Sequence, residues 1–158
     1  LNIGTRYLLM YPARRGGDCA FFIEAEPAYA EGIGDELMPV DGPKGNLNGY
    51  YLAIVKPDIA VSTKEAYAAI TPTATSKSCR EIVRQPIETW KEELVNDFEA
   101  PIFKLHPELA EIKEKLYQQG AKYAAMSGSG SALFGIFETE PNGLKEMFQD
   151  CFCEVLKL

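Results

Sequence analysis

Hydrophobic and polar residues from position 50 to the C-terminus follow two periods, one typical of helices and one typical of strands. The clearest helix is predicted over residues 106–120, where apolar positions recur every three or four residues. Pro107 suits the first turn of this helix, and Gly120 suits its C-terminal cap. Three further helices are predicted on the same grounds, over residues 64–70, 86–98 and 142–151.

Short apolar runs rich in β-forming residues predict four strands in the same part of the chain, over residues 50–56, 121–125, 132–137 and 152–158. The order of elements is then β-α-α-α-β-β-α-β. This is the split β-α-β order of a ferredoxin-like sandwich, with extra helices in the first crossover. The sequence therefore predicts an α+β fold in which an antiparallel sheet carries helices on one face.

The sequence of the N-terminal part predicts strands, followed by a boundary between domains. Strands are expected over residues 21–25 and 28–31, and residues 37–40 extend their pairing. Residues 41–49 hold Gly, Pro and Asn at high density, which is typical of a connecting loop. We expect an N-terminal domain remnant over residues 1–41 and the main domain over residues 50–158. The chain begins without methionine and its first residues show no clear period, so it has the character of a truncated sequence.

Composition and charge narrow the classes of partner. The 158 residues are 46% hydrophobic and carry a formal net charge of −7, which argues against nucleic-acid binding and an anionic membrane surface. No apolar run approaches the ~20 residues of a transmembrane helix, and no leader precedes the first strand. The four cysteines lack the spacing of a zinc site, and the lone His106 has no partner for metal or triad chemistry. We expect reduced thiols, no metal site and a cytoplasmic location.

Two segments carry candidate chemistry. The first is the glycine-serine run over residues 126–131, which lies between two apolar segments. Converging backbone N–H groups in such a bend can bind phosphate, although the glycines of a plain hairpin turn give the same pattern. The second is Asp18, which follows Gly16 and Gly17 and precedes an apolar run. A carboxylate there can accept a proton from a substrate hydroxyl, or it is simply a turn aspartate.

The segments Gly-Gly-Asp-Cys-Ala-Phe-Phe-Ile, Ala-Tyr-Ala-Glu-Gly-Ile-Gly, Val-Lys-Pro with Ser-Thr-Lys-Glu-Ala-Tyr, and Met-Ser-Gly-Ser-Gly occur in that order along the chain. Taken together they resemble the GHMP kinases, and the resemblance extends from Gly16 to the C-terminus. It implies the C-terminal GHMP-kinase domain and transfer of the γ-phosphate of ATP, with Mg²⁺, to a small-molecule alcohol. The branch it resembles most acts on the 2-hydroxyl of a methylerythritol joined to cytidine diphosphate, in non-mevalonate isoprenoid biosynthesis.

The resemblance also implies roles for individual residues. Asp18 matches the family's catalytic acid-base aspartate. Tyr67 matches an aromatic residue that stacks on the cytosine ring, although it also fits a core position of its helix. Thr63 matches a hydroxyl near the site. The family's third glycine-rich motif lies near the reacting phosphates, and its positions correspond to Gly128, Ser129 and Gly130.

Two features of the family are missing from this sequence. Its N-terminal lysine and its Pro-x-x-x-Gly-Leu-Gly phosphate loop are absent, so we expect the 158-residue chain by itself to bind nucleotide weakly and turn over little. Two alternatives stay open: a GHMP kinase for another alcohol, such as mevalonate or a sugar, and a non-catalytic ferredoxin-like ligand-binding domain. A homodimer formed through an exposed sheet edge is an arrangement that the sequence allows.

Overall fold

A computed structural model describes residues 28–32, 36–40, 47–71 and 77–158 of the chain. The chain divides into two units, residues 1–45 and 46–158. In the first unit, β1 (Ala28–Glu31) pairs antiparallel with β2 (Glu36–Pro39). The strand predicted over 28–31 is therefore confirmed, and so is its pairing with the segment that follows. The strand predicted over 21–25 lies outside the described residues.

The second unit is built on a four-stranded antiparallel sheet. Its strands are β3 (Tyr51–Pro57), β4 (Tyr123–Met126), β5 (Leu133–Phe137) and β6 (Cys151–Lys157). Their order across the sheet is β4-β5-β3-β6, so β3 and β5 are central and the other two are edges. Val55 lies opposite Leu133 on one side and Cys153 on the other. This topology confirms the ferredoxin-like order and the α+β class.

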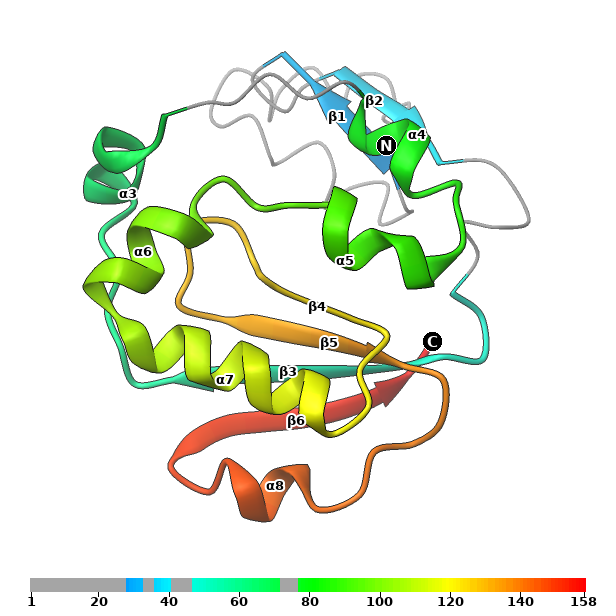
Figure 1. Cartoon of the computed structure of the whole chain (residues 1–158), viewed down its shortest axis with the longest axis vertical. Coiled ribbons are helices and arrows are strands. Elements are labelled where there is room, and N and C mark those ends of the chain that lie inside the picture. The colour runs from blue at the N-terminus through cyan, green and yellow to red at the C-terminus, as the bar shows by residue number, and fades with distance from the viewer. Residues whose placement is uncertain (1–27, 33–35, 41–46, 72–76) are drawn as a thin grey trace, which may run out of the picture. The chain divides into compact units, whose positions relative to one another are not determined.

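One face of the sheet is covered by four helices. They are α3 (Thr63–Ala69), α6 (Glu99–Leu105), α7 (Pro107–Gln118) and the short α8 (Leu144–Met147). Leu109, Ile112 and Leu116 of α7 pack with Val55 and Leu133 of the central strands in the larger hydrophobic cluster. Figure 1 shows α7 lying along the sheet, with α8 beside β6 and with α3 and α6 at the end of the sheet away from the C-terminus.

Three short helical segments in the middle of the first crossover cover part of the opposite face. They are α4 (Cys79–Ile82), the 3₁₀ turn η2 (Ile87–Thr89) and α5 (Trp90–Glu93). Along β4 the side chains alternate: Ala124 and Met126 belong to the larger cluster, whereas Tyr123 and Ala125 belong to a second one with Trp90. The Trp90 ring meets that of Tyr123 edge to face, with centroids 5.7 Å apart. The sheet therefore carries helices on a second face as well, at β4 and β5.

The single helix predicted over 86–98 is wrong. Helical backbone ends at Leu94, whose ψ is +86°, and a new helix begins at Glu99. The apolar periodicity did not predict this break, because Leu94 and Val95 continue the helical spacing of apolar residues although the backbone there is no longer helical. The helix α4 was not predicted either, although Ser78 and Glu81 form a capping box that the sequence spells out. The predicted helix over 142–151 is present only as α8, because Gly143 has a left-handed φ of +77° and Phe148 leaves the helix.

Candidate functional site

The turn between β4 and β5 has the geometry of a tight hairpin connection. Ser127 N–H donates to the Ala132 carbonyl at 2.8 Å, and Gly130 N–H donates to the Ser127 carbonyl at 3.0 Å. Gly128 and Gly130 have φ values of +55° and +91°, which side-chain-bearing residues rarely adopt. Within the described part of the chain, the N–H groups of Gly128 and Ser129 donate no hydrogen bond; Gly128 is exposed and Ser129 is half-buried. The turn therefore combines hairpin geometry with free backbone donors.

Helix α3 brings a second hydroxyl to this turn. Ser62 caps the helix by accepting the Glu65 N–H at 3.4 Å, so Thr63 lies in the first turn. Thr63 Oγ1 lies 3.5 Å from Ser129 Oγ, although the two residues are 66 positions apart in sequence. An exposed hydroxyl and a half-buried one thus converge at the end of the sheet where β3 and β4 finish and β5 begins.

Tyr67 lies one helical turn beyond Thr63, on the same face of α3. Its side chain is 65% exposed, which argues against the interpretation of Tyr67 as a core residue. One edge of the ring contacts Phe98 in a T-shaped arrangement, with centroids 4.9 Å apart. The ring is thus supported on one side and leaves surface open for another planar group.

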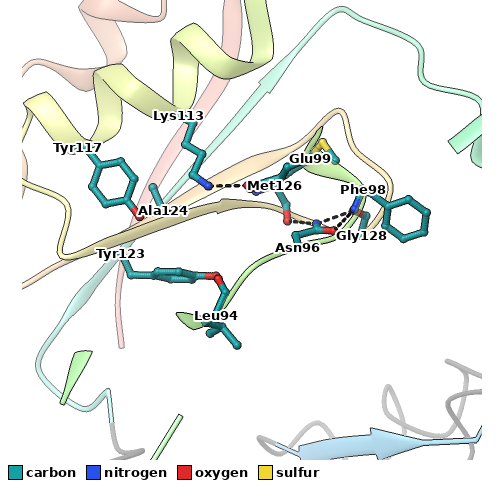
Figure 2. A network of polar contacts seen from close by, with 10 residues as sticks. All are labelled: Leu94, Asn96, Phe98, Glu99, Lys113, Tyr117, Tyr123, Ala124, Met126 and Gly128. Carbon is teal, nitrogen blue, oxygen red and sulfur yellow. Dashed lines mark hydrogen bonds and ion pairs between the residues drawn. The ribbon is translucent and has the colours of Figure 1, made fainter. Parts of the chain in front are cut away.

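Asn96 ties the turn to the segment that precedes α6. Its Nδ2 donates to the carbonyls of Met126 and Gly128, both at 2.8 Å, and its Oδ1 accepts the Phe98 N–H at 3.0 Å. Figure 2 shows the carboxamide between the turn and the backbone of Phe98. The aromatic partner of Tyr67 and the glycine-serine turn therefore share one side chain as an anchor.

Glu99 holds the end of β4, the strand that leads into the glycine-serine turn. This glutamate is buried, and its Oε1 accepts the Met126 N–H at 2.7 Å while its Oε2 pairs with Lys113 of α7. Burying a carboxylate is costly unless hydrogen bonds and an opposite charge compensate it, and both are present here. The carboxylate thereby fixes the last residue of β4 immediately before the turn.

Two tyrosines near this carboxylate have raised pKa values. Burial raises the pKa of Tyr123, and the negative charge of Glu99 raises it further. Burial likewise raises the pKa of Tyr117. The hydroxyls donate to the carbonyls of Leu94 and Ala124 at 2.8 and 3.2 Å, so they act as neutral donors that hold backbone in place.

A last anchor lies on the other side of the turn. Ser131 is buried and its Oγ donates to the Ile59 carbonyl at 2.6 Å. Ile59 follows β3 and precedes α3, so this bond joins the turn to the segment that leads to Thr63 and Tyr67. The turn is thus held from the β3–α3 connection as well as from the segment before α6.

The structure brings together five of the six site residues that the sequence singled out, at one end of the sheet. They are Thr63, Tyr67, Gly128, Ser129 and Gly130. Asp18 lies outside the described residues. Sequence reasoning missed Asn96, Glu99 and Lys113. The pair Asn96-Asp97 was a usable signal, because Asn and Asp accept backbone N–H groups two residues on and interrupt helices.

No group of three or more His, Cys, Asp or Glu side chains among the described residues is arranged to hold a metal ion. Across the same residues, no helix is both long enough and apolar enough to span a bilayer. This end of the sheet offers backbone N–H groups, two hydroxyls and an aromatic face, a set that suits a phosphorylated ligand with a planar ring.

Comparison with known proteins identifies the class. Residues 79–152 match the model of the GHMP kinase C-terminal family. The fold resembles that of a crystallised 4-(cytidine 5'-diphospho)-2C-methyl-D-erythritol kinase, with a TM-score of 0.72 and 24% identity over 96% of this chain and 57% of that one. It also resembles a homoserine kinase from Cytophaga hutchinsonii, with a TM-score of 0.57 and 14% identity. The chain belongs to the GHMP kinase family.

Within that family, curated sequences narrow the similarity further. The chain is 52% identical over 139 residues to a 4-diphosphocytidyl-2-C-methyl-D-erythritol kinase of Parabacteroides distasonis, covering 87% of this chain and 50% of the relative. It is 46% identical over 153 residues to the enzyme of that name from Bacteroides fragilis, covering 97% of this chain and 55% of the relative. The chain thus spans about half the length of the curated relatives it matches. GHMP kinases use ATP as a cosubstrate and act on small molecules.

Proposed function

We propose that the protein containing this chain transfers the γ-phosphate of ATP to the 2-hydroxyl of 4-diphosphocytidyl-2-C-methyl-D-erythritol. The observation that carries the proposal is the exposed Tyr67 ring on the same helix face as Thr63, which lies 3.5 Å from Ser129 of the glycine-serine turn. An aromatic face beside free backbone donors suits a ligand that joins a nucleobase to phosphates. Identities of 46–52% to curated enzymes of that activity support the same substrate.

Each residue of the proposed site has a distinct role. The Asp18 carboxylate accepts the proton of the attacking hydroxyl. The Tyr67 ring stacks on cytosine, which is worth ~1–3 kcal/mol per base. The Thr63 hydroxyl hydrogen-bonds the bound substrate. The free N–H groups of Gly128 and Ser129 face the phosphates, and Gly130 lets the turn adopt this geometry; donors fixed before binding stabilise developing charge without reorganisation.

Mg²⁺ in this proposal arrives with ATP. The described residues hold no carboxylate cluster for a metal, and Mg²⁺ is commonly held by substrate phosphates with one or two carboxylates. The ion supplies positive charge to the transferring group. The protein contributes position: a turn with defined backbone geometry and a ring supported by Phe98.

The proposal extends to organisation. Residues 1–41 form the part of an N-terminal kinase domain that carries Asp18, and residues 50–158 form the C-terminal domain. We also propose a cytoplasmic location. We also propose that the protein forms a homodimer. The molar mass of the purified protein in solution tests this.

The decisive experiment is an ATP-dependent phosphorylation assay of the full-length protein from which this chain derives, with the 158-residue chain assayed beside it. The cytidine substrate is compared with mevalonate, homoserine and a simple sugar at equal concentration. We expect the highest kcat/KM for the cytidine substrate. A higher kcat/KM for any of the other alcohols contradicts the proposed substrate, and turnover of none contradicts the proposed activity.

Variants of Tyr67 test the role of the exposed ring, on which the proposal rests. Tyr67→Ala should raise KM for the cytidine substrate about tenfold, because it removes the stacking surface, and should leave KM for ATP near its original value. Tyr67→Phe is the matched control and should change KM for the cytidine substrate less than about threefold, since stacking uses the ring. Equal effects of Tyr67→Ala on both substrates would indicate a packing role.

Asp18→Asn tests the chemical step. Loss of a general base typically lowers kcat by ~10²–10⁴, and the isosteric amide should leave the circular dichroism spectrum and thermal unfolding unchanged. Near-normal kcat in this variant would show that Asp18 is a structural turn residue.

A further inference from the structure

The segment from Asn96 to Glu99 closes the free edge of β4 with side chains. Because β4 is an edge strand, its outward backbone groups have no neighbouring strand. At Met126 the N–H donates to Glu99 and the carbonyl accepts from Asn96. Two side chains three residues apart thus replace a strand at the residue where β4 ends and the glycine-serine turn begins.

The Asn96 carboxamide makes hydrogen bonds through both of its N–H protons and through its oxygen. Both protons of Nδ2 have carbonyl acceptors, at Met126 and at Gly128, and Oδ1 accepts the Phe98 N–H. The position of the Phe98 N–H also fixes which end of the amide is oxygen. Aspartate has nearly the same shape but donates no proton, whereas alanine neither donates nor accepts. The two substitutions therefore remove different parts of the arrangement.

The two sides of the carboxamide lead to different parts of the site. The Nδ2 side holds the turn that contains Gly128. The Oδ1 side holds the backbone of Phe98, whose ring supports Tyr67 at 4.9 Å. These two parts come from elements far apart in sequence, and a single side chain spans them.

We propose that Asn96 is a positioning residue that sets the phosphate-facing turn and the nucleobase-facing ring relative to one another. This inference rests on the proposed function. Asn96 touches neither substrate; it acts through Gly128 on one side and through Phe98 on the other. Its two sides can be separated by the choice of variant.

Amide hydrogen exchange of the 158-residue chain, without any substrate, tests the structural half. Asn96→Asp should make the amides of Ser127 and Gly130 exchange about tenfold faster, the factor expected for two lost hydrogen bonds of modest net strength, and leave Phe98 unchanged. Asn96→Ala should accelerate exchange at all three. Asn142→Asp is the matched control, since Asn142 is an exposed asparagine in the segment before α8. Unchanged exchange at Ser127 and Gly130 in both variants overturns the inference.

Steady-state kinetics of the full-length protein test the coupling. Asn96→Asp should raise KM for ATP at least threefold and leave KM for the cytidine substrate within twofold, whereas Asn96→Ala should raise both. Phe98→Leu keeps both bonds to the turn and should raise only KM for the cytidine substrate. Equal changes in the two KM values for Asn96→Asp overturn the coupling.

The two proposals fail separately. If the unsubstituted protein does not phosphorylate the cytidine substrate, the proposed function fails, and exchange at Ser127, Gly130 and Phe98 still decides whether Asn96 joins the two parts. If Asn96→Asp does not fold, Phe98→Leu supplies the measurement from the other side: an unchanged KM for the cytidine substrate in that variant overturns the link to Tyr67.

Discussion

The two connections that lead into β5 and β6 differ in how their backbone is held. The turn before β5 is fixed by Glu99, which is 9% exposed in its side chain, pairs with Lys113 and also accepts a backbone N–H. Near the connection before β6, Lys145 and Glu154 form an ion pair whose side chains are 59% and 44% exposed. Both oxygens of the Glu154 carboxylate accept from the Lys145 ammonium. A charge pair fixes a turn when it is buried and one partner also holds the main chain.

The largest expected effect comes from removing the buried carboxylate. Glu99→Ala should lower the free energy of unfolding by ~2–4 kcal/mol, because the Met126 N–H loses its acceptor and Lys113 loses its partner. The matched Glu154→Ala should cost less than ~1 kcal/mol, as expected for an exposed pair. Urea denaturation of the 158-residue chain gives both values. Equal losses would break the comparison between the two connections.

A second pair of variants compares the glycines of the same regions. Gly130→Ala places a Cβ at a φ of +91° and 2.7 Å from the Met126 sulfur, whereas Gly143→Ala meets nothing within 4 Å at a φ of +77°. The shared left-handed φ costs ~1–2 kcal/mol, and the close approach adds about 1 kcal/mol at Gly130 because the Met126 side chain can partly move away. We expect denaturation midpoints to fall further for Gly130→Ala. A larger fall for Gly143→Ala would show that the space above Met126 is not limiting.

The smallest expected effect concerns Tyr123, whose hydroxyl holds Leu94 at the helix end before Asn96. Tyr123→Phe should cost about 1 kcal/mol at neutral pH through the lost hydrogen bond. Burial raises the pKa of this phenol in the folded state above its unfolded value of 10.0. The unfolded chain therefore loses this proton first, so stability is full below pH ~10 and falls as pH rises above it.

Urea denaturation between pH 9 and 11 measures this dependence. The loss of stability with rising pH should be shallower in Tyr123→Phe than in the unsubstituted chain, because one group with a raised pKa has been removed. Identical slopes in the two proteins would show that Tyr123 does not contribute to the alkaline loss.

The sequence predicted the parts of the fold that one local period determines. The helix expected over 106–120 is α7, Pro107–Gln118, and the strand expected over 50–56 is β3, Tyr51–Pro57. Both bury an apolar face in the larger cluster, so their patterns directly record their packing. The break after Leu94 was not predictable in this way, because its cause is a polar side chain that bonds to a strand thirty residues later.

The residues of the candidate site also differ in how far the sequence could predict them. Tyr67, Thr63 and the turn residues were assigned by resemblance to the GHMP kinases, and their roles stay predictions, as does that of Asp18. The structure adds their proximity, which depends on the β4-β5-β3-β6 order and not on any local pattern. Asn96 and Glu99 were missed because satisfying the outward groups of an edge strand leaves no periodic trace in sequence.

Trp90 gives this molecule a built-in optical probe. It is the single tryptophan of the chain, its indole N–H donates to the Gln85 carbonyl at 3.1 Å, and its ring lies in the cluster on the far side of β4 from α7. Its fluorescence therefore reports on that face of the sheet alone. Compared with circular dichroism, which follows all the helices, this emission can show whether α4, η2 and α5 detach from β4 before, or together with, the helices on the other side.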